Sequence, residues 1–160
     1  ALRIGREEGT LTLLNPAPAQ PLPDDAWNLI DVITPNQTEA PILLGMTGTD
    51  EELAQALRER TSGSVVLTRG SAGAIVVDGS GTQTVAARAV ENVVDTTGAG
   101  DAFTAALAVA LAEGRPLAAA VEFAASAGAH AVTIAGVIPS LPTREELDAA
   151  DTPAHPTTYE

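Results

Sequence analysis

The stretch "DTTGAGDAFTAALAVALAEG", Asp95 to Gly114, joins a glycine-containing turn to an apolar, alanine-rich segment. The apolar part predicts a buried helix over residues 102–112, with Asp101 at its first turn. The first N–H groups of a helix have no internal partner and carry the positive end of its dipole, so such a junction can bind an anion. Gly98 and Gly100 let a ligand approach the backbone closely. The stretch therefore predicts a phosphoryl-binding turn at the start of a buried helix.

A purely structural interpretation of the same turn is also open. Glycine-rich turns precede many helices, and an aspartate in the first turn often only caps the helix. One capping group is enough for that purpose, whereas Asp95, Thr96, Thr97 and Asp101 crowd around this turn. The surplus of polar side chains favours a binding site.

The composition indicates one α/β domain. The chain has 160 residues, of which 45% are hydrophobic and only 2% aromatic, so its core must be built from Ala, Val, Leu and Ile. These residues suit helices packed closely on a sheet. The sequence contains no apolar run of about 18 residues, the length that would predict a bilayer-spanning helix.

The charge and the N-terminal residues narrow the classes of partner. The formal net charge is −13, with 21 acidic residues against 8 basic ones, all of them arginine, and this field repels nucleic acids and anionic membranes. The sequence has no cysteine, which agrees with a cytoplasmic location. The opening "ALRIGREEG" is not a signal peptide, because Glu7 and Glu8 fall where an apolar core is needed. It resembles the end of a helix stopped by Gly9, so we expect a segment to be missing upstream.

Apolar runs and capping signals predict the order of the elements. We expect strands over residues 10–14, 29–34, 64–68, 74–78 and 82–87. We expect helices over residues 37–45, 49–60, 102–112 and 116–132, a last short helix after Thr143, and loops over 15–25 and 133–140. This order predicts a three-layer α/β/α fold whose mainly parallel sheet ends in an antiparallel hairpin. Residues 1–149 form the domain, and residues 150–160 are expected to be a disordered tail.

Two further motifs lie where predicted strands end. "TPNQTEA" places Asn36 and Glu39 at such an edge, where open α/β sheets bind ligands, although this motif alone favours a helix cap and a surface charge. "TRGSAG", Thr68 to Gly73, offers backbone donors and a hydroxyl, or is an ordinary turn. A P-loop is excluded because the sequence has no lysine, and no G-x-G-x-x-G follows the first strand.

Taken together, "DTTGAGD", "PNQTEA" and "LTRGSAG", with "NPAP" upstream, resemble motifs of the PfkB carbohydrate kinase family in its ribokinase branch. The resemblance extends over about residues 1–149. It implies that Asp101 is the general base, with the N–H groups of Gly98, Ala99 and Gly100 as the anion hole for the transferred phosphoryl group. It also implies ATP and Mg²⁺ contacts by Asn36, Glu39, Thr68, Gly70, Ser71, Gly73, Gly100 and Asp101, and a K⁺ site formed by Asp95, Thr97, Ala131, Gly136 and Ser140.

The implied activity is transfer of the γ-phosphate of ATP to the primary hydroxyl of a sugar, with D-ribose the expected substrate. The family's N-terminal part, with its β lid and most sugar contacts, is not found in this sequence. Two alternatives stay open: a truncated nucleotide-binding or interaction module without turnover, and a PfkB kinase acting on fructose phosphates, adenosine or a vitamin. We also expect an uncovered sheet edge, and with it a homodimer or another association through that edge.

Overall fold

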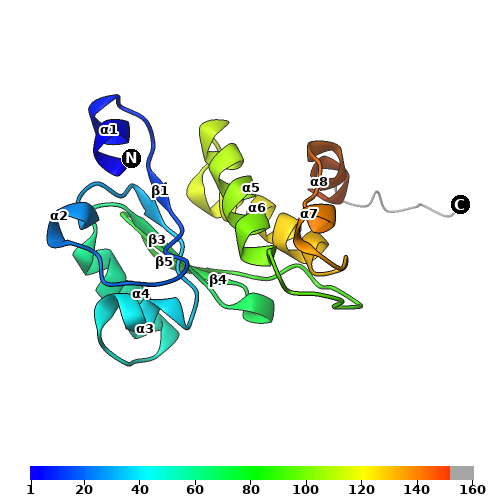
Figure 1. The fold of residues 1–160 in the computed structure, drawn as a ribbon, viewed down its shortest axis with the longest axis horizontal. Helices are drawn as coiled ribbons and strands as arrows, with labels where there is room; N and C mark the ends of the chain where they lie inside the picture. Colours follow the sequence, from blue (N-terminus) through cyan, green and yellow to red (C-terminus); the bar gives the residue numbers. More distant parts are fainter. Residues whose placement is uncertain (152–160) are drawn as a thin grey trace, which may run out of the picture.

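The sheet has five strands among residues 1–151, the part of the chain that the computed structural model describes. The strands are β1 (Leu13–Leu14), β2 (Val32–Ile33), β3 (Ser64–Thr68), β4 (Ala74–Asp78) and β5 (Gly81–Val85), and they lie side by side in this order (Figure 1). β1, β2 and β3 run parallel, whereas β4 and β5 follow as antiparallel neighbours. The predicted mixed sheet with an antiparallel hairpin at one edge is confirmed.

Helices cover both faces of the sheet. Because successive side chains of a strand point to opposite faces, one strand contributes to two cores. Val65 and Leu67 of β3 face a core formed with α2 (Asp24–Trp27), α3 (Glu39–Leu44) and α4 (Asp50–Arg60). Val66 faces the opposite core, formed with α5 (Ala99–Ala112), α6 (Leu117–Ala131) and α8 (Arg144–Asp151). The predicted three-layer α/β/α architecture is therefore confirmed. The two remaining helices are α1 (Leu2–Glu7) and α7 (Val137–Ser140).

The two predicted capping boxes form. The N–H of Thr49 donates to Glu52 at 2.8 Å, and the N–H of Glu52 donates back to the Thr49 hydroxyl at 3.2 Å. Thr143 and Glu146 make the same exchange at 2.7 and 3.3 Å. These reciprocal bonds satisfy N–H groups that have no partner inside the helix and so fix where α4 and α8 begin.

Several predicted boundaries are wrong. The loop over residues 15–25 ends early, because α2 begins at Asp24 directly after Pro23, with two acidic residues in its first turn. Residues 133–140 include the one-turn helix α7, and α5 begins at Ala99 rather than at residue 102. Ala150 and Asp151 belong to α8 and not to a tail, while the remainder of the predicted tail lies outside the described residues.

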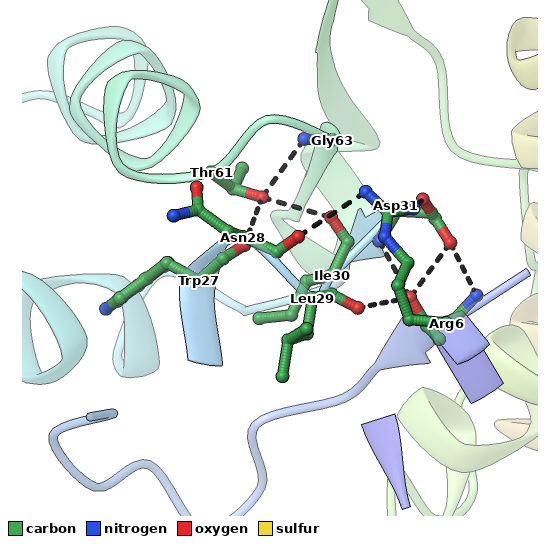
Figure 2. A network of polar contacts seen from close by, with 9 residues as sticks. Arg6, Trp27, Asn28, Leu29, Ile30, Asp31, Thr61 and Gly63 are labelled. Atoms are coloured by element: carbon green, nitrogen blue, oxygen red, sulfur yellow. Dashed lines mark hydrogen bonds and ion pairs between the residues drawn. The ribbon is translucent and has the colours of Figure 1, made fainter. Parts of the chain in front are cut away.

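Polar contacts tie the start of the chain to the segment before β2. Asp31 forms an ion pair with Arg6 of α1, and it accepts hydrogen bonds from the N–H and the hydroxyl of Thr12 at 2.8 and 2.9 Å (Figure 2). Burial alone would raise the pKa of Asp31, but the bonds from Thr12 and the charge of Arg6 together lower it below its ordinary value. Asp31 therefore stabilises the fold as a carboxylate.

A second polar contact joins α4 to the chain that follows α2. The hydroxyl of Thr61, buried at the end of α4, lies 3.1 Å from the carbonyl of Trp27 and 3.2 Å from that of Ile30 (Figure 2). The same hydroxyl accepts the N–H of Gly63 at 3.1 Å. These bonds fix the turn that leads from α4 into β3.

We expect Asp31→Asn to lower the free energy of unfolding at pH 7 relative to the unsubstituted chain. Because the folded state lowers the pKa of Asp31, its contribution is complete above the ordinary value of 3.8 and is lost as the pH falls through the folded-state pKa. Urea unfolding at a series of pH values should show that the difference in free energy of unfolding between the two proteins narrows as the pH falls. Asp25→Asn is the control, because Asp25 pairs with Arg3 on the surface, and it should change stability by less than about 0.5 kcal/mol. A difference that stays constant with pH would contradict the assignment.

Candidate active site

A cleft lies where the carboxyl ends of the three parallel strands face the N-terminus of α5. Its volume is about 160 Å³. The residues that line it are Asn15, Ala17, Thr34, Asn36, Glu39, Thr68, Gly98, Gly100, Asp101, Phe103 and Thr104. The structure thus brings together the two motifs "TPNQTEA" and "DTTGAGD", which are about 60 residues apart in the sequence.

Asn36 and Glu39 form one wall of the cleft, and their local role is to cap α3. The side-chain oxygen of Asn36 accepts the N–H groups of Thr38 and Glu39, both at 2.9 Å. In return, the Glu39 carboxylate accepts the N–H of Asn36, also at 2.9 Å. The capping interpretation of this motif is therefore right, and the same bonds hold both side chains at the edge of the cleft.

The opposite wall is the first turn of α5. Gly98 is the residue before the helix and has a φ of 82°, a left-handed conformation that favours glycine. No side chain caps this helix, and within residues 1–151 the exposed carboxylate of Asp101 makes no hydrogen bond. Asp101 therefore makes no capping hydrogen bond to α5.

The N–H groups of this first turn differ in their availability. The N–H of Ala99 donates to the carbonyl of Thr96 at 3.3 Å, a long bond. The N–H groups of Gly100 and Asp101 have no acceptor among the described residues. Unpaired donors at the positive end of a helix of 14 residues are suited to bind an anion.

The glycines of "TRGSAG" lie outside the cleft. Gly70 and Ser71 belong to the short 3₁₀ turn Gly70–Ala72, and of this motif only Thr68 lines the cleft. At Gly73 the φ is 84°, and a Cβ would come within 2.1 Å of the carbonyl oxygen of Val85. The hairpin between β3 and β4 therefore requires glycine at this position. Nucleotide contacts by these three residues stay a prediction.

Asp95 links two loops near the start of α5. Its carboxylate accepts the N–H of Thr97 at 2.9 Å and that of Gly136 at 3.1 Å. The N–H and hydroxyl of Thr97, followed by the N–H of Gly136, lower the pKa of Asp95 below its ordinary value. Three of the five residues predicted to hold K⁺ thus lie together, with an anionic oxygen among them. Ala131 ends α6 and buried Ser140 ends α7, where its hydroxyl donates to Val137.

The charged side chains that line the cleft are both acidic, Glu39 and Asp101. Within residues 1–151 no group of three or more His, Cys, Asp or Glu side chains could hold a metal ion unaided. Two carboxylates with amide and hydroxyl oxygens nearby do suit Mg²⁺, which commonly takes one or two carboxylates together with phosphate oxygens and water. The residues therefore fit Mg²⁺ that arrives with a phosphate ligand.

Several residues that line this cleft were not predicted as site residues: Asn15, Ala17, Thr34, Phe103 and Thr104. Asn15 and Thr34 each follow the last residue of a parallel strand, β1 and β2. Their position at strand ends was the available signal, because parallel strands deliver the residues at their carboxyl ends to one edge. Buried Phe103 and half-buried Thr104 carried no comparable signal, since both lie inside the predicted helix and not at its end.

These features define an α/β protein with unpaired N–H groups at a helix terminus on the carboxyl edge of its sheet. Residues 1–144 match the family model described as pfkB family carbohydrate kinase, and the chain belongs to this family. It is similar to the ribokinase of Haemophilus influenzae, with 37% identity over 91% of this chain and 49% of the relative. The Bacillus subtilis ribokinase is 40% identical over 85% of this chain and 44% of the relative.

Solved structures support the same family. The ribokinase of Thermotoga maritima superposes with a TM-score of 0.84 at 33% identity, over 92% of this chain and 51% of that one. The Arabidopsis thaliana ribokinase, solved in complex with ribose and ATP, also gives a TM-score of 0.84 at 33% identity, over 92% and 49% of the two chains. The chain therefore spans about half the length of the relatives it matches. Within residues 1–151, no helix has the length and apolar character needed to cross a bilayer.

We expect Gly98→Ala and Gly100→Ala to have opposite effects on folding stability. At Gly98 a Cβ would lie 2.8 Å from Cγ1 of Val137 in addition to the left-handed φ, so alanine should destabilise the fold by about 1–3 kcal/mol. At Gly100 a Cβ meets no atom within 4 Å, and alanine in a helix should be neutral or stabilising by up to about 1 kcal/mol. Chemical denaturation of both variants measures this. Equal destabilisation would mean that Gly100 also has a structural role.

Proposed function

We propose that this chain carries the phosphoryl-donor site of an ATP-dependent sugar kinase, with D-ribose as the acceptor. The observation that carries the proposal is the unpaired Asp101 carboxylate beside unpaired N–H groups at the start of α5, in one cleft with Asn36 and Glu39. A hydroxyl that attacks a phosphorus atom needs a group to accept its proton and donors to stabilise the charge on the phosphoryl oxygens. Asp101 and the first turn of α5 supply these two functions side by side.

The size of the cleft indicates which part of ATP it holds. Sites for whole cofactors usually measure about 300–1,000 Å³, whereas this cleft measures about 160 Å³. It therefore suits the terminal phosphates, with the nucleoside lying outside it. The N–H groups of Gly100 and Asp101 would donate to the transferred phosphoryl group, and such a donor typically stabilises a transition state by roughly 2.7–4 kcal/mol.

Magnesium would bind on the side of Asn36 and Glu39. When bound, Mg²⁺ neutralises phosphate charge, which matters here because both charged side chains of the cleft are negative. Glu39 keeps its place through the Asn36 N–H, so it can hold the hydrated ion without losing the cap of α3. Asp101, on the other wall, then stays available for the sugar hydroxyl.

A second function is a nucleotide-binding module without turnover. The described residues supply a phosphate-binding cleft, whereas a kinase also needs a site for the acceptor sugar. Isothermal titration with Mg²⁺ and ATP tests binding, and an ADP-release assay with D-ribose tests turnover. Binding without ribose-dependent ADP release would favour the module, and absence of binding would contradict both functions.

We expect Asp101→Asn to lower ribose-dependent turnover by at least about 10²-fold, because the amide cannot accept the hydroxyl proton. The affinity for Mg²⁺ and ATP should be unchanged or slightly higher, since one negative charge leaves the cleft. The assay is carried out on a polypeptide that includes this chain and that has ribose-dependent turnover before substitution. Asp24→Asn is the matched control, because Asp24 is also an acidic residue in the first turn of a helix but lies on the surface of α2. Turnover of Asp101→Asn at the level of this control would contradict the role of Asp101 as a base.

We further expect K⁺ to activate turnover more than Na⁺ does. Asp95 offers a carboxylate whose pKa is lowered, and its bonds to Thr97 and Gly136 connect the turn before α5 to the loop before α7. A monovalent cation bound there would stiffen the turn that presents the anion hole. Initial rates in matched chloride salts measure the effect. Equal rates in both salts would remove the cation site from the proposal.

A further inference from the structure

Asn15 is a lining residue of the cleft whose side chain has no hydrogen-bond partner among the described residues. Asn15 lines the cleft together with Asp101 and Glu39, and within residues 1–151 its amide makes no hydrogen bond. Asn36, the other asparagine of the cleft, differs because its side-chain oxygen accepts two N–H groups and a hydroxyl at the start of α3. The capping of α3 explains Asn36, whereas nothing in the described fold explains the amide of Asn15.

The backbone holds Asn15 in place even though its side chain is unbound. The preceding residue, Leu14, belongs to β1, and its carbonyl accepts the N–H of Thr34 at 2.9 Å. The next residue, Pro16, is buried and restricts Asn15 to an extended backbone that continues the strand. Asn15 itself is half-buried. The backbone of Asn15 is therefore held in place while its side-chain amide has no partner, an arrangement that suits contact with a ligand.

The charges in the cleft determine what kind of contact this is. With Glu39 and Asp101 as the charged lining residues, phosphate oxygens here need donors that add no negative charge. The hydroxyl of Thr34 already has an acceptor, because it donates to the Leu14 carbonyl at 3.4 Å. The amide of Asn15 has two N–H groups and no such acceptor.

We propose that Asn15 binds the terminal phosphoryl group of the nucleotide, donating from the strand side while the first turn of α5 donates from the other. This inference rests on the proposed function, since it assigns a third set of donors to the same phosphoryl group. Asn15 would contact the γ-phosphoryl group of ATP, which ADP lacks, so its contact should distinguish the two nucleotides.

Isothermal titration of the 160-residue chain with Mg²⁺ and either ATP or ADP tests the proposal. A hydrogen bond to a charged group corresponds to about 10-fold to 100-fold in affinity. We expect Asn15→Ala to weaken ATP binding by about this factor, Asn15→Asp to weaken it further by adding a negative charge, and neither to change ADP binding. Asn28→Asp is the control, because it adds the same charge at an exposed residue at the end of α2.

The outcomes separate this proposal from the proposed function. If the unsubstituted chain binds neither nucleotide, the proposed function and the role of Asn15 are both contradicted. If it binds ATP and Asn15→Asp matches Asn28→Asp, only the role of Asn15 is overturned. Should the Asn15 variants fail to fold, ¹⁵N NMR of the unsubstituted chain replaces them. The assigned side-chain NH₂ signals of Asn15 should then shift with Mg²⁺ and ATP and stay in place with ADP, and equal shifts with both would overturn the proposal.

Discussion

The N-terminus of α5 is held in place from two sides, and the cleft depends on this. The buried face of α5 packs with α6 in the core on one side of the sheet, through residues such as Phe103 and Leu107. At its start, Gly98 adopts a left-handed backbone with Val137 of α7 close enough to exclude a larger side chain. Core packing prevents α5 from shifting along its axis, and the Gly98 turn prevents it from beginning earlier in the sequence. Its unpaired N–H groups therefore stay at the carboxyl edge of the sheet.

The acidic character of the chain shapes the chemistry of that cleft. A lysine would be the simplest partner for a phosphate, but the sequence has none, and no arginine lines the cleft. Attraction for an anion comes instead from backbone N–H groups, neutral side chains and the helix dipole, which amounts to roughly half a positive charge at the N-terminus. Such a site does not neutralise the negative charge of a triphosphate by itself. Under the proposed function, a phosphate ligand here would depend on a metal ion, with Glu39 as its protein contact.

The sequence predicted the layers, the antiparallel hairpin at the edge of the sheet and the two capping boxes, because these follow from local periodicity and short-range bonds. It misplaced α2 and α7, each a single turn whose ends depend on packing rather than on pattern. Asn36, Glu39, Thr68 and Asp101 could be predicted as site residues because each belongs to a motif, and the structure does bring them to one cleft. Asn15 was missed although it follows a predicted strand, and Thr104 carried no signal, since its place in the cleft arises only when separate segments meet in space.

The two groups of donors in the cleft come from different parts of the fold, and this separation has a chemical consequence. Strand ends supply Asn15, Asn36 and Thr68, whereas α5 supplies backbone N–H groups and the Asp101 carboxylate. A phosphoryl group between the two walls would be held in one orientation, with a carboxylate on a single side of it. Because an attacking hydroxyl must approach along the line of the bond that breaks, Asp101 defines the direction from which an acceptor enters. We therefore expect the acceptor site of the proposed kinase to lie on the α5 side of the cleft, away from the Glu39 wall.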